Sequence, residues 1–366
     1  MDRIALPVQA MFSDLEQRIH DADFAETFDL AGHFRRQKRG NRFYWYWQRR
    51  QGSKVINKYV GPYTDKQITE RVRRHEELKS DYDERRAIVH ALISGGLPRT
   101  DAISGEVAEA MWRAGFFRLR GILIGTTAFQ CYAGVLGVRL PNPTTSTQDA
   151  DFAQYFAIAN MIDDAMPPIL DVLRGVDETF RPIPHITGSS QTTAFANSAK
   201  YRVEFLTPNR GSDDLEGRPA PVPAFGGAAA EPMRFLDFLI RNPIRSVLLH
   251  AAGVPVTIPA PERYAIHKLI ISERRGEEFA SKVNKDIAQA SSLIEALRHS
   301  RYSDVSAAWQ EAWERGKGWR SAMMQGMSRL DEEIVAKLGQ AVRKGAARRR
   351  KKFDDFWPEQ FALDLE

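Results

Sequence analysis

The sequence predicts an α+β fold, and three observations support this expectation. Residues 42–60 alternate aromatic and β-branched side chains around a short glycine-containing turn, the pattern of a β-hairpin. Short apolar runs bounded by glycine, proline or polar loops, typical of buried strands, occur at residues 119–125, 149–153 and 201–208. From residue 262 to about residue 349 the composition and periodicity are helical. We expect a mixed sheet with flanking helices between an N-terminal hairpin-and-helix region and a C-terminal helical bundle.

The chain of 366 residues is long enough for two or three compact units, each with its own core. We predict an N-terminal region over residues 1–115, a central domain over 116–260, and a C-terminal helical domain with a basic tail over 261–366. A long run of helix formers in the first region has Thr64 or Asp65 as a candidate N-cap. A shorter helix is expected to end at Gly115, where a left-handed C-cap is tolerated.

The central domain should alternate strands and helices. We expect one helix capped by Thr126 or Thr127 and a second over about residues 154–173. Residues 209–232 are dominated by Gly, Pro and Ala and are predicted to form a long irregular connection. Residues 245–261 read as another hairpin.

Composition excludes two classes of protein. The single cysteine, Cys131, rules out an intramolecular disulfide and a cysteine-rich zinc site, which fits a reducing compartment. No stretch reaches the roughly 18 uncharged apolar residues that a membrane span needs. We therefore expect a cytoplasmic protein with no membrane partner.

Three acidic residues occupy strand positions that suit metal chemistry. Asp149 and Asp151 are two apart on one predicted strand, so both carboxylates should project from the same face. Glu204 lies between Val203 and Phe205 on another predicted strand and should point away from the core. Divalent cations that bind phosphates are held by oxygen ligands, so these acids are candidate metal ligands and catalytic residues.

A glycine turn precedes these acids. Gly125, Thr126 and Thr127 follow a predicted strand and open a predicted helix. Backbone N–H groups at a helix N-terminus favour anions, so the turn is a candidate phosphate site. Each feature alone is a weak signal, and the ordinary alternatives are a turn glycine and a solvated strand acid. Their order along the chain strengthens the joint interpretation.

In this order the residues resemble the nucleotidyltransferase superfamily, in particular the minimal prokaryotic branch that includes the abortive-infection and type IV toxin nucleotidyltransferases. The matching segments are LIGTTA, DADFA and VEFLTP, within a resemblance over roughly residues 117–300. The resemblance implies Mg²⁺ or Mn²⁺ on Asp149, Asp151 and Glu204, with Glu204 helping to deprotonate the acceptor hydroxyl. It implies phosphates held at Gly125 and Thr126, and, for a toxin, an antitoxin partner.

The resemblance continues into the helices after the central domain. Lys268 matches a lysine that contacts the triphosphate, while Lys285 and Asp286 match a Lys-Asp pair and Arg274 or Arg275 an arginine. A solvated helix face is an equal alternative for the arginines and the Lys-Asp pair. Two positions depart from the family pattern: Thr126 replaces a serine or glycine, and Glu204 replaces an aspartate. The longer Glu204 side chain could alter the metal geometry.

The predicted N-terminal hairpin carries an uneven share of the charge. Between His33 and Tyr63 there are nine Lys or Arg and no Asp or Glu, while the whole chain has a net charge of +5. Such a segment suits a nucleic-acid partner, and the candidate contacts are Arg42, Arg49, Arg50, Lys54 and Lys58. The aromatic residues at alternate positions, Phe43, Trp45 and Trp47, either pack against a helix or stack on bases.

Together these features predict an enzyme that transfers a nucleoside monophosphate from a nucleoside triphosphate to a hydroxyl. The basic segments favour an RNA acceptor, such as the end of a tRNA. Two alternatives stay open: nucleotidylation of a protein hydroxyl, and a module on the same fold that binds nucleic acid without turnover.

Overall fold

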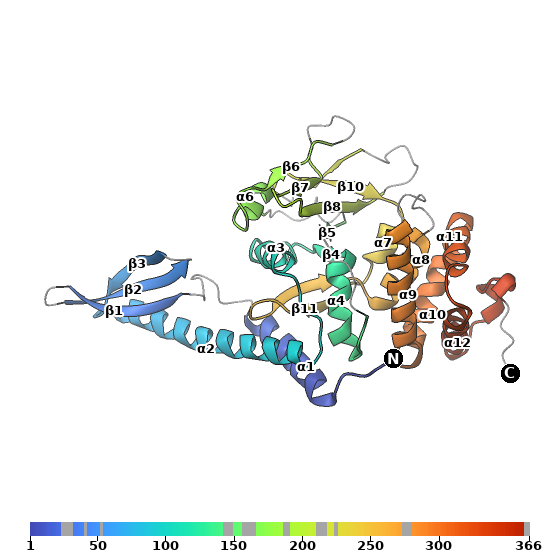
Figure 1. Ribbon diagram of the computed structural model, residues 1–366, viewed down its shortest axis with the longest axis horizontal. Coiled ribbons are helices and arrows are strands. Elements are labelled where there is room, and N and C mark those ends of the chain that lie inside the picture. Colours follow the sequence, from blue (N-terminus) through green and yellow to red (C-terminus); the bar gives the residue numbers. More distant parts are fainter. Residues whose placement is uncertain are drawn as a thin grey trace.

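The computed structural model describes residues 1–22, 32–39, 42–51, 54–141, 149–155, 166–185, 191–209, 218–222, 226–272 and 280–361. The fold is mixed α+β, as predicted: an N-terminal sheet with helices, a central mixed sheet with flanking helices, and a C-terminal helical region (Figure 1). Within the described ranges, no helix is both long enough and apolar enough to span a bilayer.

The N-terminal sheet confirms the predicted hairpin and extends it. Strands β2 (Arg42–Gln51) and β3 (Lys54–Pro62) pair antiparallel, while the intervening Gly52 and Ser53 lie outside the described residues. A further strand, β1 (His33–Arg39), pairs with β2 and was not predicted. Figure 1 shows this sheet at one end of the molecule, with helix α2 (Lys66–Ser94) running from it to the body.

Helix α2 begins at one of the two residues that its sequence predicts as an N-cap. The Asp65 carboxylate accepts a hydrogen bond from the Ile68 N–H at 3.2 Å, so Asp65 is the N-cap, and Gly96, with φ +97°, follows its end. Its C-terminal half packs on helix α1 (Leu6–Ala22) through a core that includes Leu15 and Leu92. These contacts fix the end of α2 that is remote from the sheet.

The central sheet has the order β4-β5-β8-β10-β9, and β7 with β6 joins at β8. Strands β5 and β8 are parallel, β4 is antiparallel to β5, and β7 and β10 share the other edge of β8. The bounds are β4 Ile122–Ile124, β5 Asp149–Ala153, β6 Arg181–Pro182, β7 Ala194–Ala196, β8 Arg202–Pro208, β9 Ala220–Pro221 and β10 Ala229–Met233. Helices α3 (Ala102–Arg113), α4 (Gly125–Leu136) and α6 (Ile169–Arg174) accompany the sheet.

One face of β5 and β8 builds the core. Phe152 and Phe205 are stacked with ring centroids 5.9 Å apart, and Phe116 lies edge-on to Phe152 at 5.1 Å. All three rings are fully buried. Because side chains alternate along a strand, this packing directs the residues beside the phenylalanines to the opposite face of the sheet.

The C-terminal region confirms the predicted hairpin and helices. The hairpin is β11 with β12, and helices α8 to α12 follow it. The bounds are α7 Leu236–Leu239, β11 Ile244–Leu248, β12 Val254–Ile258, α8 Pro261–Ser272, α9 Ala280–Ser300, α10 Tyr302–Glu314, α11 Lys317–Met327 and α12 Glu332–Arg348, followed by the short turns η4 Phe353–Asp355 and η5 Glu359–Phe361. The fully buried Trp309 donates to the Phe356 carbonyl at 2.8 Å, which ties the last residues to α10.

Two predicted details of the central domain are wrong, and a third is covered only in part by the described residues. Helix α4 starts at Gly125 with Ile124 as its N-cap, so neither Thr126 nor Thr127 caps it. Of the helix predicted over about residues 154–173, α6 confirms Ile169–Arg174, whereas residues 154, 155 and 166–168 are not helical. Residues 156–165 lie outside the described residues. The connection predicted over residues 209–232 contains β9 and most of β10. Pairing of β10 with β8, and of β9 with β10, outweighs the weak strand preference of Ala and Pro.

Candidate active site

The structure brings the three predicted carboxylates to one face of the central sheet. In the parallel register of β5 with β8, Asp151 lies opposite Glu204 and Asp149 lies opposite Arg202. Neighbouring strands are about 4.8 Å apart, and paired positions share a face. Ala150, Phe152, Val203 and Phe205 occupy the other face and are buried.

Gly125 closes the site beside Asp151. Strand β4 pairs with β5 so that Ile124 faces Asp151, and the chain then turns into α4 with a φ of +69° at Gly125. A Cβ atom added at Gly125 would overlap the Asp151 Oδ2 atom. Both the left-handed backbone and the close approach require glycine at this position.

The carboxylates repel one another in this half-buried setting. Burial, together with the nearby Asp149 and Glu204 carboxylates, raises the pKa of Asp151 to about 7, whereas Lys268 and Lys282 act in the opposite direction. A carboxyl group shifted this far is one that gains from a nearby cation. A cation bound at this site would therefore stabilise the charged form of these carboxylates.

An arginine lies within the same row of side chains. The Arg202 guanidinium contacts the Glu204 carboxylate at 2.7 Å, with side chains 51% and 32% exposed. Both residues are on one face of β8 because they are two positions apart. Among the described residues, no three His, Cys, Asp or Glu side chains are already gathered around one point as a metal site. In this arrangement the Glu204 carboxylate is held by Arg202.

Helices α8 and α9 supply a buried polar layer beside the glycine turn. The Lys268 ammonium contacts the Asp286 carboxylate at 2.6 Å, and both side chains are at most 10% exposed. The Tyr264 hydroxyl lies 3.0 Å from the Gly125 carbonyl oxygen and 3.1 Å from Gln289 Oε1. These contacts attach the two helices to the turn that borders Asp151.

Lys285, which is next to Asp286 in α9, adds a further cation. Burial lowers the pKa of Lys285, and the neighbouring Lys268 lowers it further, while Asp149, Asp286 and Asp151 raise it. The predicted lysines thus lie within electrostatic reach of the carboxylates. Arg274 and Arg275 lie outside the described residues.

The two threonines of the turn are buried. Thr126 is 9% exposed and Thr127 is 2% exposed, and the Thr127 carbonyl accepts from the Cys131 thiol. Direct contact of the Thr127 hydroxyl with a ligand would need the core to open.

The predicted nucleic-acid contacts are far from this site in the fold, on β2 and β3. Arg49 is half-buried. The side chains of Arg42, Arg50, Lys54 and Lys58 lie outside the described residues, although the backbone of each is within a strand. Their role stays a prediction.

Residues that sequence analysis did not single out complete the site. Arg202 could have been found, because it is two positions from Glu204 on a predicted strand. Tyr264 and Gln289 carried no local signal. Tyr264 contacts Gly125 across 139 positions of the chain, and Gln289 contacts Tyr264 from the next helix.

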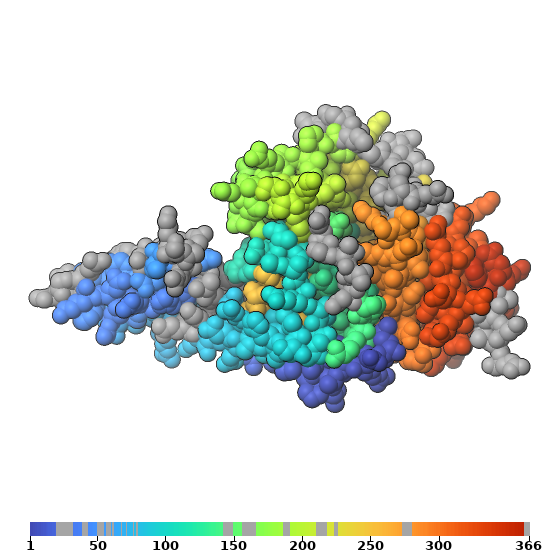
Figure 2. All heavy atoms as spheres, viewed as in Figure 1, coloured from blue at the N-terminus to red at the C-terminus, as the bar shows by residue number. Residues whose placement is uncertain are grey.

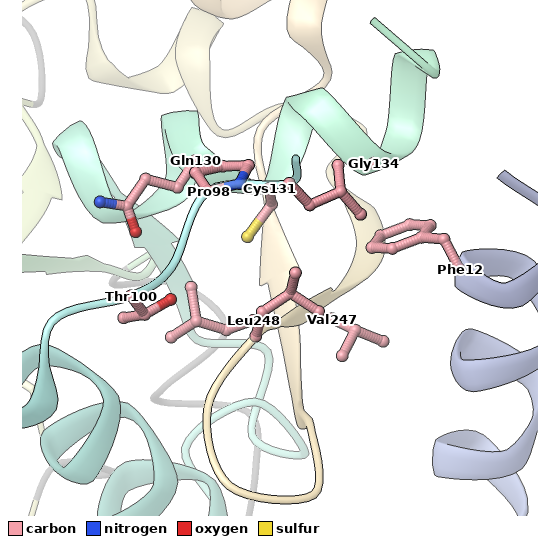
Figure 3. Close-up of a pocket in the computed structure, with 10 residues that line it drawn as sticks. Phe12, Pro98, Thr100, Gln130, Cys131, Gly134, Val247 and Leu248 are labelled. Carbon is pink, nitrogen blue, oxygen red and sulfur yellow. The ribbon is translucent and has the colours of Figure 1, made fainter. Parts of the chain in front are cut away.

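A separate small pocket lies away from the carboxylates (Figure 3). Its lining comes from α1, residues 97–100, α4 and β11, and is mostly apolar. The Cys131 thiol lies against it, and burial raises the pKa of Cys131 to about 12. A thiol with such a pKa is not a nucleophile at neutral pH.

Comparison with known families agrees with this geometry. Residues 102–314 match the model of a nucleotidyltransferase family, a range that contains Asp149, Asp151, Glu204 and Lys268. The chain belongs to this nucleotidyltransferase family. Residues 12–70 match a domain of unknown function (DUF6788). No curated protein and no solved structure matches the chain. The transferase match extends past 116–260 on both sides, and the predicted domain division stays a prediction.

Family membership implies a divalent metal, and the residues present fit one. The candidate ligands are all carboxylate oxygens, the donors that Mg²⁺ prefers. Burial, and then repulsion from Asp149 and Glu204, raises the pKa of Asp151, and a bound cation would favour its charged form. Glu204 fits as a third ligand once its carboxylate leaves Arg202.

The Asp151 carboxyl should make the metal-free protein less stable at high pH. Its pKa is about 7 in the folded state and 3.8 in the unfolded state, so the folded state binds more protons between these values. The free energy of unfolding therefore falls as the pH rises from about 4 to 7. With EDTA at pH 8, Asp151→Asn should be more stable than the wild type by about 2–4 kcal/mol, and the difference should vanish near pH 4. Urea denaturation measures this.

Asp177→Asn is the matched control with the opposite sign. Hydrogen bonds from Thr179, and one from Asn197, lower the pKa of Asp177, so this substitution should reduce stability at pH 8. If Asp151→Asn were no more stable than the wild type at pH 8, the charged Asp151 carboxylate would not be destabilising as inferred from its burial and its acidic neighbours.

Gly125→Ala should displace the Asp151 carboxylate and weaken metal binding. The left-handed backbone adds about 1–3 kcal/mol of strain, and the new methyl group meets Asp151 Oδ2. Gly227→Ala is the control, because Gly227 has a φ of +91° with open space around it. Mn²⁺ titration should show weakened binding for Gly125→Ala alone; similar Mn²⁺ affinity in both variants would argue against the close packing of Gly125 on Asp151.

Arg202→Gln should tighten metal binding by several-fold. The substitution removes a cation that competes for Glu204, and since the pair is exposed, the free energy of unfolding should change by no more than about 1 kcal/mol. Arg181→Gln, which removes an exposed arginine from β6 of the same sheet, is the control. Mn²⁺ affinity is measured by electron paramagnetic resonance, and equal affinities of the two variants would disprove the competition.

Proposed function

We propose that this nucleotidyltransferase moves a nucleoside monophosphate from a nucleoside triphosphate to a hydroxyl acceptor and releases pyrophosphate. The observation that carries the proposal is the register of β5 with β8, which places Asp151 opposite Glu204 beside Asp149, with Gly125 packed on Asp151. Family membership supports the class of reaction.

Asp149, Asp151 and Glu204 would hold the Mg²⁺ or Mn²⁺. When bound, the metal neutralises charge on the phosphates and lowers the pKa of the attacking hydroxyl. The all-carboxylate donor set and the raised pKa of Asp151 support these three residues as ligands.

The N-terminus of α4 would bind the phosphates. The helix of 12 residues starts at Gly125, and its first N–H groups have no partner within the helix. Its dipole favours an anion there. Because Thr126 and Thr127 are buried, phosphate contact would use the backbone of Gly125 and Thr126.

Lysines from α8 and α9 would balance the triphosphate charge. Lys268 uses one of its three N–H donors on Asp286, and Lys285 lies within electrostatic reach of Asp149. With Arg202 released from Glu204, three cations would surround the carboxylates. Together with a bound divalent metal, these cations would suit a ligand with several negative charges.

Glu204 is the residue placed to accept the acceptor's proton. It is half-buried and lies on the sheet face shared with Asp151. The acceptor oxygen would attack the α-phosphorus, the bond from that phosphorus to the bridging oxygen of the β-phosphate would break, and the hydroxyl proton would pass to Glu204. Exposure of Arg202 and Glu204 leaves this side open to an incoming acceptor.

RNA is the acceptor that the charge distribution favours. The nine Lys or Arg between His33 and Tyr63, with no acid among them, match a polyanion. A protein hydroxyl is the second candidate. The resemblance to abortive-infection and type IV toxin enzymes adds the hypothesis of an antitoxin partner. A module that binds without turnover is less well supported, because all three acids are present on one face.

Radiolabelled transfer tests the proposal directly. The protein is incubated with each α-labelled nucleoside triphosphate, Mg²⁺ and total RNA. Wild type should label RNA, and the Asp149→Ala, Asp151→Ala double variant should lose at least about a hundredfold in rate, as expected when charge stabilisation is removed. Gel separation of RNA from protein then shows which of the two carries the label and is the acceptor.

Asp354→Ala with Asp355→Ala is the matched control, because it removes two exposed acids from η4. It should label RNA at the wild-type rate. Label on the protein would replace RNA by a protein hydroxyl as acceptor. No label with any triphosphate would contradict the transfer reaction and favour the binding module.

A further inference from the structure

An exposed cluster of aromatic rings and cations lies on the N-terminal sheet. The ring centroids of Phe43 and Tyr63 are 6.5 Å apart, and those of Trp45 and Tyr63 are 5.2 Å apart. The Arg36 guanidinium lies 4.7 Å from the centroid of Phe43 and 5.1 Å from that of Tyr63, and the Lys38 ammonium lies 6.0 Å from that of Phe43. We call these five residues the aromatic-cation cluster.

Helix α2 covers only part of the sheet face that carries this cluster. Phe34 contacts His75 of α2 at 4.7 Å, and the Trp45 Nε1–H donates to the Thr69 hydroxyl at 3.2 Å. Residues 43, 45 and 47 share this face, and their exposure rises along it: Trp47 is 4% exposed, Trp45 is half-buried and Phe43 is 39% exposed. The inner aromatic residues thus pack on the helix, whereas the outer ones extend past its start.

At the exposed end of this face, the described residues offer aromatic rings but no carboxylate to the two cations. Phe43 and Tyr63 are 39% and 37% exposed, among the few large apolar side chains that are exposed in the described part of the chain. Arg36 and Lys38 are exposed, and no carboxylate among the described residues pairs with them. The segment from His33 to Tyr63 contains no acid that could do so. Aromatic faces beside uncompensated cations suit an anionic ligand with planar groups.

We propose that the aromatic-cation cluster is a stacking site for an unpaired base of single-stranded RNA. A base would lie on Phe43 or Tyr63, and Arg36 and Lys38 would neutralise the adjoining phosphates. This inference depends on the proposed function only in taking RNA as the acceptor. It assigns the contact to residues other than the predicted arginines and lysines of β2 and β3.

The cluster is remote from the carboxylates. Helix α2 has 29 residues, which span about 44 Å at 1.5 Å each, and it separates the sheet from the body (Figure 1). Figure 2 shows the sheet as a projection at one end of the molecular surface. An RNA that reaches both sites must bridge from the sheet to the body. Short acceptors would therefore reach only one of them.

RNA binding without nucleotide tests the cluster. The affinity of a fluorescent, unstructured 30-nucleotide RNA is measured by anisotropy for wild type and for the Phe43→Leu, Tyr63→Leu double variant. Loss of stacking on two rings should weaken binding by about 10- to 100-fold. Arg36→Gln should reduce the slope of log affinity against log salt by about 0.7, the value for one phosphate contact on a single strand.

Arg343→Gln is the matched control. Arg343 is an exposed arginine whose guanidinium lies 4.9 Å from the Phe353 ring centroid, far along the chain from the sheet. It removes the same charge from the same kind of contact and should leave RNA affinity and salt slope unchanged. If the double leucine variant fails to fold by circular dichroism, the salt slope of Arg36→Gln still decides.

Wild-type RNA affinity in the cluster variants, or equal losses in Arg343→Gln, would overturn the proposal, as would preference for an acidic protein over RNA. The Asp149→Ala, Asp151→Ala variant should bind the 30-nucleotide RNA as the wild type does. If the wild type binds RNA but transfers no nucleotide, the proposed function is wrong and the stacking site is not. If the cluster variants transfer to the 30-nucleotide RNA at the wild-type rate, the stacking site is wrong and the proposed function is not. With a 5-nucleotide acceptor, cluster variants should transfer at the wild-type rate.

Discussion

The parallel pairing of β5 with β8 is the interaction on which the site depends. It sets Asp151 opposite Glu204 on one face and stacks Phe152 on Phe205 at 5.9 Å on the other. A slip of one residue would turn the acids into the core and the phenylalanines into water. The buried aromatic rings therefore fix the positions of the carboxylates. Their apolar packing offsets the repulsion between the carboxylates on the opposite face.

The surroundings of the site balance that charge without cancelling it. Arg202 holds Glu204 at the exposed edge, and Lys268 is paired with Asp286 in the interior. Tyr264 links the glycine turn to the helices that carry these lysines. The carboxylates and the cations thus belong to a single connected layer, in which an anionic substrate and its metal would meet opposite charges already in place.

Local pattern predicted some parts of this molecule and not others. Alternation along a strand identified the faces of Asp149, Asp151 and Glu204, and helix signals located Asp65 and Gly115 correctly. Pairing between distant segments could not be predicted from local sequence. Such pairing makes Ala229–Met233 a strand, although its sequence is typical of a loop, and a long-range contact brings Tyr264 to Gly125. Gln154, expected to begin a helix, is instead not helical, and its side-chain amide donates to the Leu119 carbonyl, a tertiary contact that local preference does not reveal.

The length of α2 has a geometric consequence. The helix joins the N-terminal sheet to the body, and most of it lies between the two segments that match known families, which end at residue 70 and begin at residue 102. With 3.6 residues per turn, one residue more or fewer would rotate the sheet by about 100° about the helix axis and shift it by about 1.5 Å. The number of residues in α2 therefore sets the direction in which the sheet faces relative to the carboxylates. Only an insertion or deletion of whole helical turns would keep that direction.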